Sequence, residues 1–179
     1  KVVENSTKDS GLSLIVPSVD FKVEARYKNK TCKVNKFKGF ISRKIEIPEN
    51  IDPRKITTAV ITETDGSIRH VPTYVTIIDG KYYAEINALT NSTYTLIYNK
   101  VSFSDVTDSH WAKADIEKMA SRLVVEGKKN DTFGPDKAVT RGELAKAIVR
   151  ALGLKPVAID KFDDIDSDSE IAGYIGTAY

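Results

Sequence analysis

The sequence predicts a two-part chain, an N-terminal all-β sandwich of immunoglobulin-like type followed by an α-helical region of helix–loop–helix repeats. Apolar and polar residues alternate repeatedly in residues 13–100, which is the period of half-buried strands. Asp65-Gly66 and Asp79-Gly80 separate runs rich in β-branched residues and are strong hairpin signals. From Asn99-Lys100 onward, helical spacing replaces this alternation, so we expect a domain boundary there.

The β part contains about seven expected strands. The clearest alternation runs from Val19 to Tyr27, with apolar residues at every second position. The expected strands cover residues 19–27, 45–47, 56–62, 67–71, 74–78, 81–86 and 93–98. Short antiparallel strands of this kind favour a sandwich. The Cys…Trp…Cys pattern of true immunoglobulin domains is absent, so only the architectural class is implied.

The helical part contains two apolar stripes at helical spacing. The first stripe precedes Gly127, which we expect to cap its helix, and consists of Ile116, Met119, Ala120, Leu123 and Val124. The second stripe precedes Gly153 and consists of Leu144, Ile148, Ala151 and Leu152. We assign Phe103, Phe133 and Leu144 to the core. The expected organisation is a linker at 1–12, a β-sandwich at 13–100, a first helical repeat at 101–155 and the start of a second at 156–179.

A series of motifs in residues 103–154 resembles the S-layer homology (SLH) repeat. These motifs are Phe103-Ser104-Asp105-Val106, His110-Trp111-Ala112, Thr132-Phe133-Gly134-Pro135 and Val139-Thr140-Arg141-Gly142-Glu143. A shift of 59 residues places Phe103 on Phe162 and Asp105 on Asp164, so a second repeat is expected to begin there. The resemblance implies a module that holds exported proteins on the walls of Gram-positive and related bacteria, usually as three packed repeats. On this basis we expect the chain to be truncated at about one and a half repeats, in which form it would bind weakly or not at all.

Thr140-Arg141-Gly142-Glu143 carries the sharpest site prediction. Thr140 and Glu143 have the spacing of a capping box at a helix start. A capping role does not explain Arg141, whose guanidinium opposes the helix dipole but suits a carboxylate. In the family this stretch reads Thr-Arg-Ala-Glu and its Arg helps to bind an acidic wall glycan, commonly one that ends in a pyruvylated amino sugar. The resemblance therefore implies a glycan contact at Arg141, with Thr140 and Glu143 beside it.

Trp111 and Arg122 complete the candidate ligand-binding set. Trp111 is the only Trp, and its indole can stack on a sugar ring or can instead staple the helix entry to the core. Arg122 provides a second positive contact, with a surface ion pair as the alternative. We expect His110 to form hydrogen bonds at the helix entry, and Asp105 to organise the turn before that helix.

Composition narrows the remaining functional classes. Residues 1–100 hold 16 Lys and Arg against 11 Asp and Glu, whereas residues 101–179 hold 11 against 14. The sequence shows no nucleic-acid-binding stripe, zinc-ligand cluster, phosphate loop or catalytic triad. It has no run apolar enough to span a bilayer. Cys32 is the single cysteine, so an internal disulfide is excluded. We therefore expect no catalytic residues, no metal and no cofactor. Asp164, Asp166 and Asp168 match calcium-loop positions, but Ser169 and Ile175 replace the required Gly and Glu.

The functional hypothesis is a non-enzymatic, secreted cell-surface protein fragment. It would attach to an acidic secondary cell-wall polymer through SLH repeats, without nucleic-acid binding or membrane insertion. One alternative is a structural spacer whose sandwich makes lattice contacts or self-assembles without binding polymer. Another is the anchor of a wall-bound polysaccharide hydrolase with its catalytic domain upstream.

Overall fold

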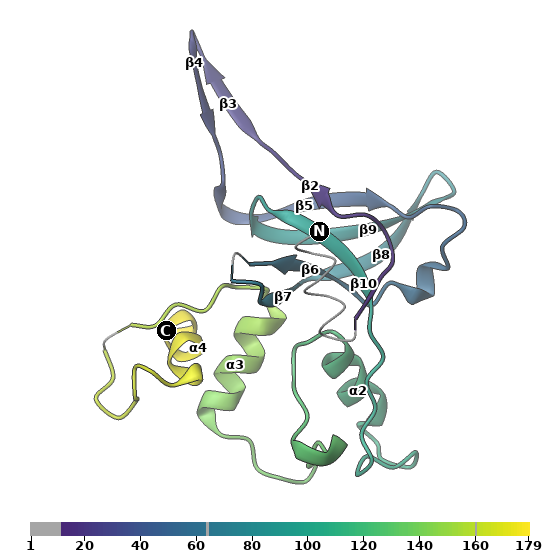
Figure 1. Ribbon diagram of the computed structural model, residues 1–179, viewed down its shortest axis with the longest axis vertical. Coiled ribbons are helices and arrows are strands. Elements are labelled where there is room, and N and C mark those ends of the chain that lie inside the picture. The colour runs from purple at the N-terminus through teal and green to yellow at the C-terminus, as the bar shows by residue number, and fades with distance from the viewer. Residues whose placement is uncertain (1–11, 64, 160) are drawn as a thin grey trace. The chain divides into compact units, whose positions relative to one another are not determined.

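The chain forms two compact units that divide between Asn99 and Lys100 (Figure 1). The structure is a computed structural model that describes residues 12–63, 65–159 and 161–179. Each unit has its own hydrophobic cluster. The predicted linker at 1–12 lies outside the described residues except for Leu12, which is buried.

The first unit consists of antiparallel sheets. One sheet has the order β1-β10-β6-β7, with β2 also paired to β10, a second has the order β5-β9-β8, and β3 pairs with β4 as a separate hairpin. The strands are β1 (Ser13–Leu14), β2 (Val19–Asp20), β3 (Glu24–Tyr27), β4 (Lys30–Lys33), β5 (Lys36–Glu46), β6 (Thr58–Thr62), β7 (Ile68–Val71), β8 (Thr73–Ile78), β9 (Lys81–Thr90) and β10 (Thr93–Tyr98). A short 3-10 turn, η1 (Pro53–Lys55), precedes β6.

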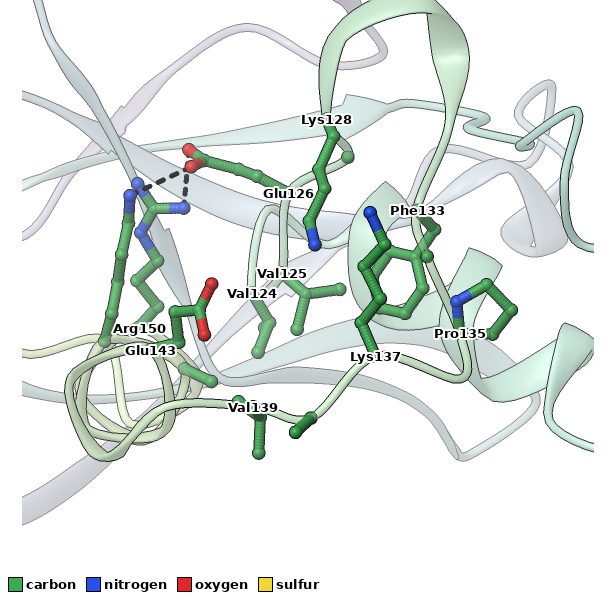
Figure 2. A pocket seen from close by; sticks show the side chains of 15 residues that line it. Val124, Val125, Glu126, Lys128, Phe133, Pro135, Lys137, Val139, Glu143 and Arg150 are labelled. Carbon is green, nitrogen blue, oxygen red and sulfur yellow. Dashed lines mark hydrogen bonds and ion pairs between the residues drawn. The ribbon is translucent and has the colours of Figure 1, made fainter.

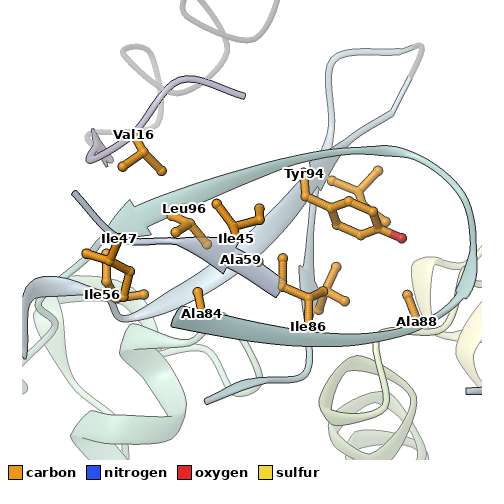
Figure 3. Close-up of a cluster of buried hydrophobic side chains, with 12 residues drawn as sticks. Val16, Ile45, Ile47, Ile56, Ala59, Ala84, Ile86, Ala88, Tyr94 and Leu96 are labelled. Atoms are coloured by element: carbon orange, nitrogen blue, oxygen red, sulfur yellow. The ribbon is translucent and has the colours of Figure 1, made fainter. Parts of the chain in front are cut away.

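The two larger sheets of this unit share one core. Ile45 of β5 and Ile86 of β9 come from one sheet, whereas Ala59 of β6 and Leu96 of β10 come from the other, and all four side chains are buried in the same cluster (Figure 3). The strand pairing nevertheless differs from the immunoglobulin type. The last two strands of that fold lie in the same sheet, whereas β9 and β10 lie in different sheets here. The first unit is therefore a β domain of another connectivity.

The predicted strand over residues 19–27 is divided in the structure. Val19 and Asp20 pair with β10, whereas Glu24–Tyr27 form β3, which pairs only with β4 and is exposed at all four residues. Val19 and Phe21 pack against the core of the unit, but the alternation from Val23 to Tyr27 does not reflect a buried face. The predicted strands did not include β4, and they covered only the last part of β5.

The prediction of an α-helical region of helix–loop–helix repeats is wrong. Strand residues predominate in the described chain, and only three α-helices form there: α2 (Lys113–Ser121), α3 (Arg141–Ala151) and α4 (Glu170–Ala178). These helices contain 9, 11 and 9 residues, and turns, bends and the 3-10 segment η2 (Lys129–Asp131) separate them. Helical spacing in the sequence therefore overstated the helix content.

The end of α2 shows why the apolar spacing predicted too long a helix. The stripe continues to Val124, but α2 stops at Ser121 because Leu123 adopts a left-handed conformation with φ of 64°. Gly127 consequently does not cap this helix. A side chain at Gly127 would instead collide with the ring of Phe103, so glycine is needed here for close packing.

The apolar stripe of α3 also differs from the expectation. Leu144, Ile148 and Leu152 are exposed, whereas Val149 is buried. The assignment of Leu144 to the core is therefore wrong, although Phe103 is buried and Phe133 packs against the same cluster.

Candidate functional site

The segment between α2 and α3 is held in place by Asp105. The Asp105 carboxylate accepts hydrogen bonds from the backbone N–H groups of Phe133 at 2.8 Å and Gly134 at 2.7 Å. The Phe133 bond is the main cause that lowers the pKa of Asp105 below its usual value. Stacking of Phe133 against Phe103, with ring centroids 5.2 Å apart, secures the same segment from the core side. A fixed loop therefore faces the start of α3.

The start of α3 forms the predicted capping box. The Thr140 hydroxyl accepts a hydrogen bond from the Glu143 backbone N–H at 3.2 Å, and the Glu143 carboxylate accepts one from the Thr140 backbone N–H at 2.8 Å. The latter bond is the largest of the effects that lower the pKa of Glu143. The capping-box prediction is confirmed, and Glu143 already has a structural role.

A pocket of about 480 Å³ lies between this loop and α3 (Figure 2). Apolar side chains from both elements and several charged side chains line it. The lining residues are Val124, Val125, Glu126, Gly127, Lys128, Phe133, Gly134, Pro135, Lys137, Ala138, Val139, Glu143, Lys146, Ala147 and Arg150. A wall of this mixed composition suits a small ligand with both an apolar and a charged part.

Two cations of the pocket are occupied by Glu126. Its carboxylate lies 2.9 Å from Lys146 Nζ and 2.6 Å from Arg150 Nη1, both on α3. These cations also lie close to Glu170 of α4, at 2.7 Å and 3.6 Å, and Arg150 Nε donates to the Tyr174 hydroxyl at 3.1 Å. The network joins α3 to α4 and to the segment after α2, so it is primarily structural.

Lys128 and Lys137 are the cations of the pocket that remain available. Within the described part of the chain, neither ammonium group forms a hydrogen bond or an ion pair. A Cβ atom built on Gly134 would lie 3.4 Å from Lys128 Nζ and 3.2 Å from Lys137 Cδ, so both side chains pass over this glycine. Figure 2 shows their ends directed toward the same space. The arrangement offers two ammonium groups to an anion beside an apolar wall.

The structure distributes the predicted site residues over several places. Glu143 lines the pocket, whereas Arg141 is exposed at the first position of α3 and Arg122 caps the C-terminus of α2. Trp111 is 89% exposed just before α2. Among the described residues, no hydrogen bond, ion pair or ring contact joins Trp111, Arg122 and Arg141 to one another.

The high exposure of Trp111 bears on its two alternative roles. Its ring stacks only on His110, with centroids 5.9 Å apart, and does not join the buried cluster. His110 itself accepts a hydrogen bond from the Ala112 backbone N–H through Nδ1 at 3.2 Å, as expected for a residue at the helix entry. The indole is therefore accessible to a ligand, and it is not a core staple.

Sequence reasoning did not select Lys128 or Lys137. Their positions depend on a turn in which the Lys137 N–H donates to the Gly134 carbonyl, and on the left-handed conformation of Gly134. The Gly134-Pro135 dipeptide marks this turn in the sequence, and it was the only available signal.

Other classes of site are not evident in the described residues. The Asp, Glu, His and Cys side chains among them form no group of three or more that could hold a metal ion. Asp166 accepts a hydrogen bond from the Asp168 backbone N–H at 3.0 Å, which is a local turn. As for the membrane, no helix in the described ranges has the length and apolarity needed to cross it.

Comparison with known proteins places most of the pocket's lining residues, those up to Glu143, in a recognised module. The S-layer homology domain family matches residues 102–145. Amylopullulanase of Thermoanaerobacterium thermosulfurigenes is 32% identical over 144 residues, which is 78% of this chain and 8% of that enzyme. Exoglucanase XynX of Acetivibrio thermocellus is 36% identical over 51% of this chain, and endo-1,4-beta-xylanase A of Thermoanaerobacterium saccharolyticum is 40% identical over 44%.

These matches cover only a small part of each relative. The chain spans about 8% of the length of the first two enzymes and 7% of the third. No solved structure matches the chain significantly. The matched range includes Lys128, Lys137 and all five predicted site residues. Because this family model and the enzymes above match it, the chain carries an S-layer homology domain and is a secreted, cell-wall-attached surface protein.

Proposed function

We propose that the pocket between the Asp105-bound loop and α3 binds an acidic group of a secondary cell-wall polymer. S-layer homology domains bind such polymers in general. The observation that supports acidic specificity is the pair of ammonium groups of Lys128 and Lys137 at one pocket, which form no hydrogen bond or ion pair in the described residues and interact with Glu143 and Asp105 only at longer range. A carboxylate placed between them would form two charge-assisted hydrogen bonds.

The apolar wall of the pocket suits the rest of such a ligand. Val124, Val125 and Phe133 lie beside the two lysines. A pyruvyl ketal carries a methyl group next to its carboxylate, so the methyl group could contact these side chains while the carboxylate meets the lysines. This arrangement supports a binding role, and the two carboxylates of the pocket are already engaged by Thr140, Lys146 and Arg150. We therefore propose a non-catalytic attachment module.

Trp111, Arg122 and Arg141 are proposed as further glycan contacts. All three are separate from the polar networks that hold the unit together. The 89% exposure of Trp111 leaves its ring available for stacking on a sugar. Arg141 is exposed and makes no ion pair within the described residues, so its guanidinium is available to a second carboxylate.

Co-sedimentation with cell walls tests the proposal. The chain would be mixed with Thermoanaerobacterium saccharolyticum sacculi, either intact or stripped of secondary polymer. Lys128→Gln/Lys137→Gln is expected to weaken binding about tenfold for each lost charged hydrogen bond, and Arg141→Ala should weaken it as well. The matched control is Lys100→Gln/Lys118→Gln, which removes the same charge at exposed positions.

The outcomes are distinct. Binding that disappears on stripping and falls only in the pocket variants supports the proposal. Equal losses in the pocket and control variants would show that only total charge matters, and the acidic-group site would be wrong. If neither the parent nor any variant co-sediments with intact sacculi, the proposal that this chain binds the polymer is wrong.

The three relatives favour a second proposal about the whole protein. Their names describe polysaccharide-degrading enzymes, and this chain matches about a twelfth or less of each. We propose that the chain attaches a polysaccharide hydrolase to the wall. Sequencing of the complete gene tests this, because an upstream glycosidase domain would support it and a protein made only of β domains and SLH repeats would refute it.

A further inference from the structure

The β3–β4 hairpin projects from the sheets of the first unit (Figure 1). Its register pairs Glu24 with Lys33, Ala25 with Cys32, Arg26 with Thr31 and Tyr27 with Lys30. All eight of these residues are exposed. The ribbon therefore presents both faces and its tip to the surroundings.

Positive charge is concentrated in this hairpin and its flanks. Residues 22–38 contain seven Lys and Arg and a single acidic residue, Glu24. Lys22 is paired with Asp20 at 3.1 Å, and Glu24 lies directly opposite Lys33. The charges at the tip, on Arg26, Lys28 and Lys30, have no carboxylate partner among the described residues.

An aromatic ring lies beside Lys28 and Lys30, while Arg26, the residue before Tyr27, lies on the opposite face of the ribbon. Tyr27 is 74% exposed, and Lys28 Nζ lies 5.4 Å from the centroid of its ring. Lys30 is the direct cross-strand partner of Tyr27, so its side chain lies on the same face of the ribbon. The tip thus combines an open aromatic face with positive charges on two sides.

This combination has a cost for the folded chain. Two-stranded hairpins are marginally stable in water, and neighbouring like charges reduce that stability further. Lysines alone would be explained as protection of exposed strand edges against aggregation. Edge protection does not explain a tyrosine that is 74% exposed beside these cations, because an exposed aromatic ring favours association.

We propose that the hairpin tip, formed by Arg26, Tyr27, Lys28 and Lys30, is a binding site for an acidic polysaccharide. The Tyr27 ring would stack on a sugar, and the three cations would contact its carboxylate or phosphate groups. The site lies in the β domain and is independent of the S-layer homology domain. Where both sites engage one polymer, linkage between them raises the overall affinity.

The test uses the full chain carrying Lys128→Gln/Lys137→Gln, so that the proposed pocket does not contribute. Binding would be measured by titration with carboxymethyl-dextran and with neutral dextran of the same length. Replacement of the three tip cations, in Arg26→Gln/Lys28→Gln/Lys30→Gln, should weaken binding to the acidic polymer about fivefold for each charge at low salt. The matched control Lys55→Gln/Lys100→Gln/Lys118→Gln should change it by less than about twofold.

Tyr27→Ala separates a glycan site from simple charge attraction. It should weaken binding to carboxymethyl-dextran severalfold, whereas Tyr27→Phe should preserve it, since the ring face is retained. Circular dichroism of each variant would check that the β domain remains folded. The proposal is overturned if the control weakens binding as much as the tip variant, if Tyr27→Ala has no effect, or if a DNA duplex binds the tip as tightly as the acidic polysaccharide.

Discussion

Replacing Glu126 by Gln should loosen the attachment of the segment after α2 to α3. The substitution keeps the shape of the side chain but removes the charge that Lys146 and Arg150 contact at 2.9 Å and 2.6 Å. Both cations are only 17% exposed, whereas Glu126 is 57% exposed, so solvent screening reduces the effect. We expect the free energy of unfolding of this region to fall by about 1 kcal/mol, a value between those of an exposed ion pair and of a buried charged hydrogen bond.

The same carboxylate predicts a pH dependence. Burial raises the pKa of Glu126, but the hydrogen bonds from Lys146 and Arg150 outweigh it, so the pKa lies below its ordinary value of 4.5. Because the folded-state pKa is depressed, the stabilisation is complete above pH 4.5 and is lost as the pH falls through the lower folded-state value. In Glu126→Gln this part of the acid sensitivity should disappear.

Hydrogen exchange measures the effect where it is expected. A loss of about 1 kcal/mol speeds exchange that proceeds through local opening about fivefold. Peptides covering 122–132, the segment that carries Glu126, should show this acceleration at neutral pH, while peptides from 81–98 in the β domain should not change. Glu49→Gln, at an exposed position of the first unit, is the control. Unchanged exchange in 122–132, or equal acceleration in both units, would refute the role assigned to the network.

Two further substitutions test the packing of each unit. Gly127→Ala should destabilise the second unit by about 1–3 kcal/mol, since the added methyl group collides with Phe103; thermal denaturation that leaves this unit unchanged would contradict the contact. Arg43→Met should destabilise the β domain by about 2–4 kcal/mol. Arg43 is only 6% exposed, and its guanidinium donates to Asn91 Oδ1 at 2.6 Å and lies over the Tyr94 ring. A urea midpoint equal to that of the parent would rule out this role for Arg43.

Strand prediction succeeded where burial and turn chemistry agreed. The Asp79-Gly80 turn joins β8 to β9, and both residues have positive φ. The strand expected at residues 93–98 has the same bounds as β10. The prediction for 19–27 failed in its second half, because the alternation from Val23 to Tyr27 has no buried counterpart although Val19 and Phe21 pack against the core. A single sequence does not reveal whether a second sheet covers a strand.

The helical unit was harder to predict for a different reason. Apolar spacing identifies a helix face but not where the backbone leaves the helix, which Leu123 determines with its left-handed φ. Gly142 is a second example. A Cβ there would lie 2.8 Å from Ile171 Cδ1, so the glycine allows this side chain of α4 to approach the start of α3. Such reasons lie in neighbours that are distant in sequence.

Partnering of charge separates structural cations from candidate ligand contacts in this protein. Lys146 and Arg150 are matched by Glu126 and Glu170, and a neutral replacement on either side should therefore change stability. Lys128 and Lys137 form no hydrogen bond or ion pair in the described structure and interact with Glu143 and Asp105 only at longer range. Their replacement should therefore leave stability nearly unchanged and alter binding instead. If replacing the pocket lysines lowered stability while replacing Lys146 or Arg150 lowered only binding, the absence of an ion pair would be no guide to the ligand site.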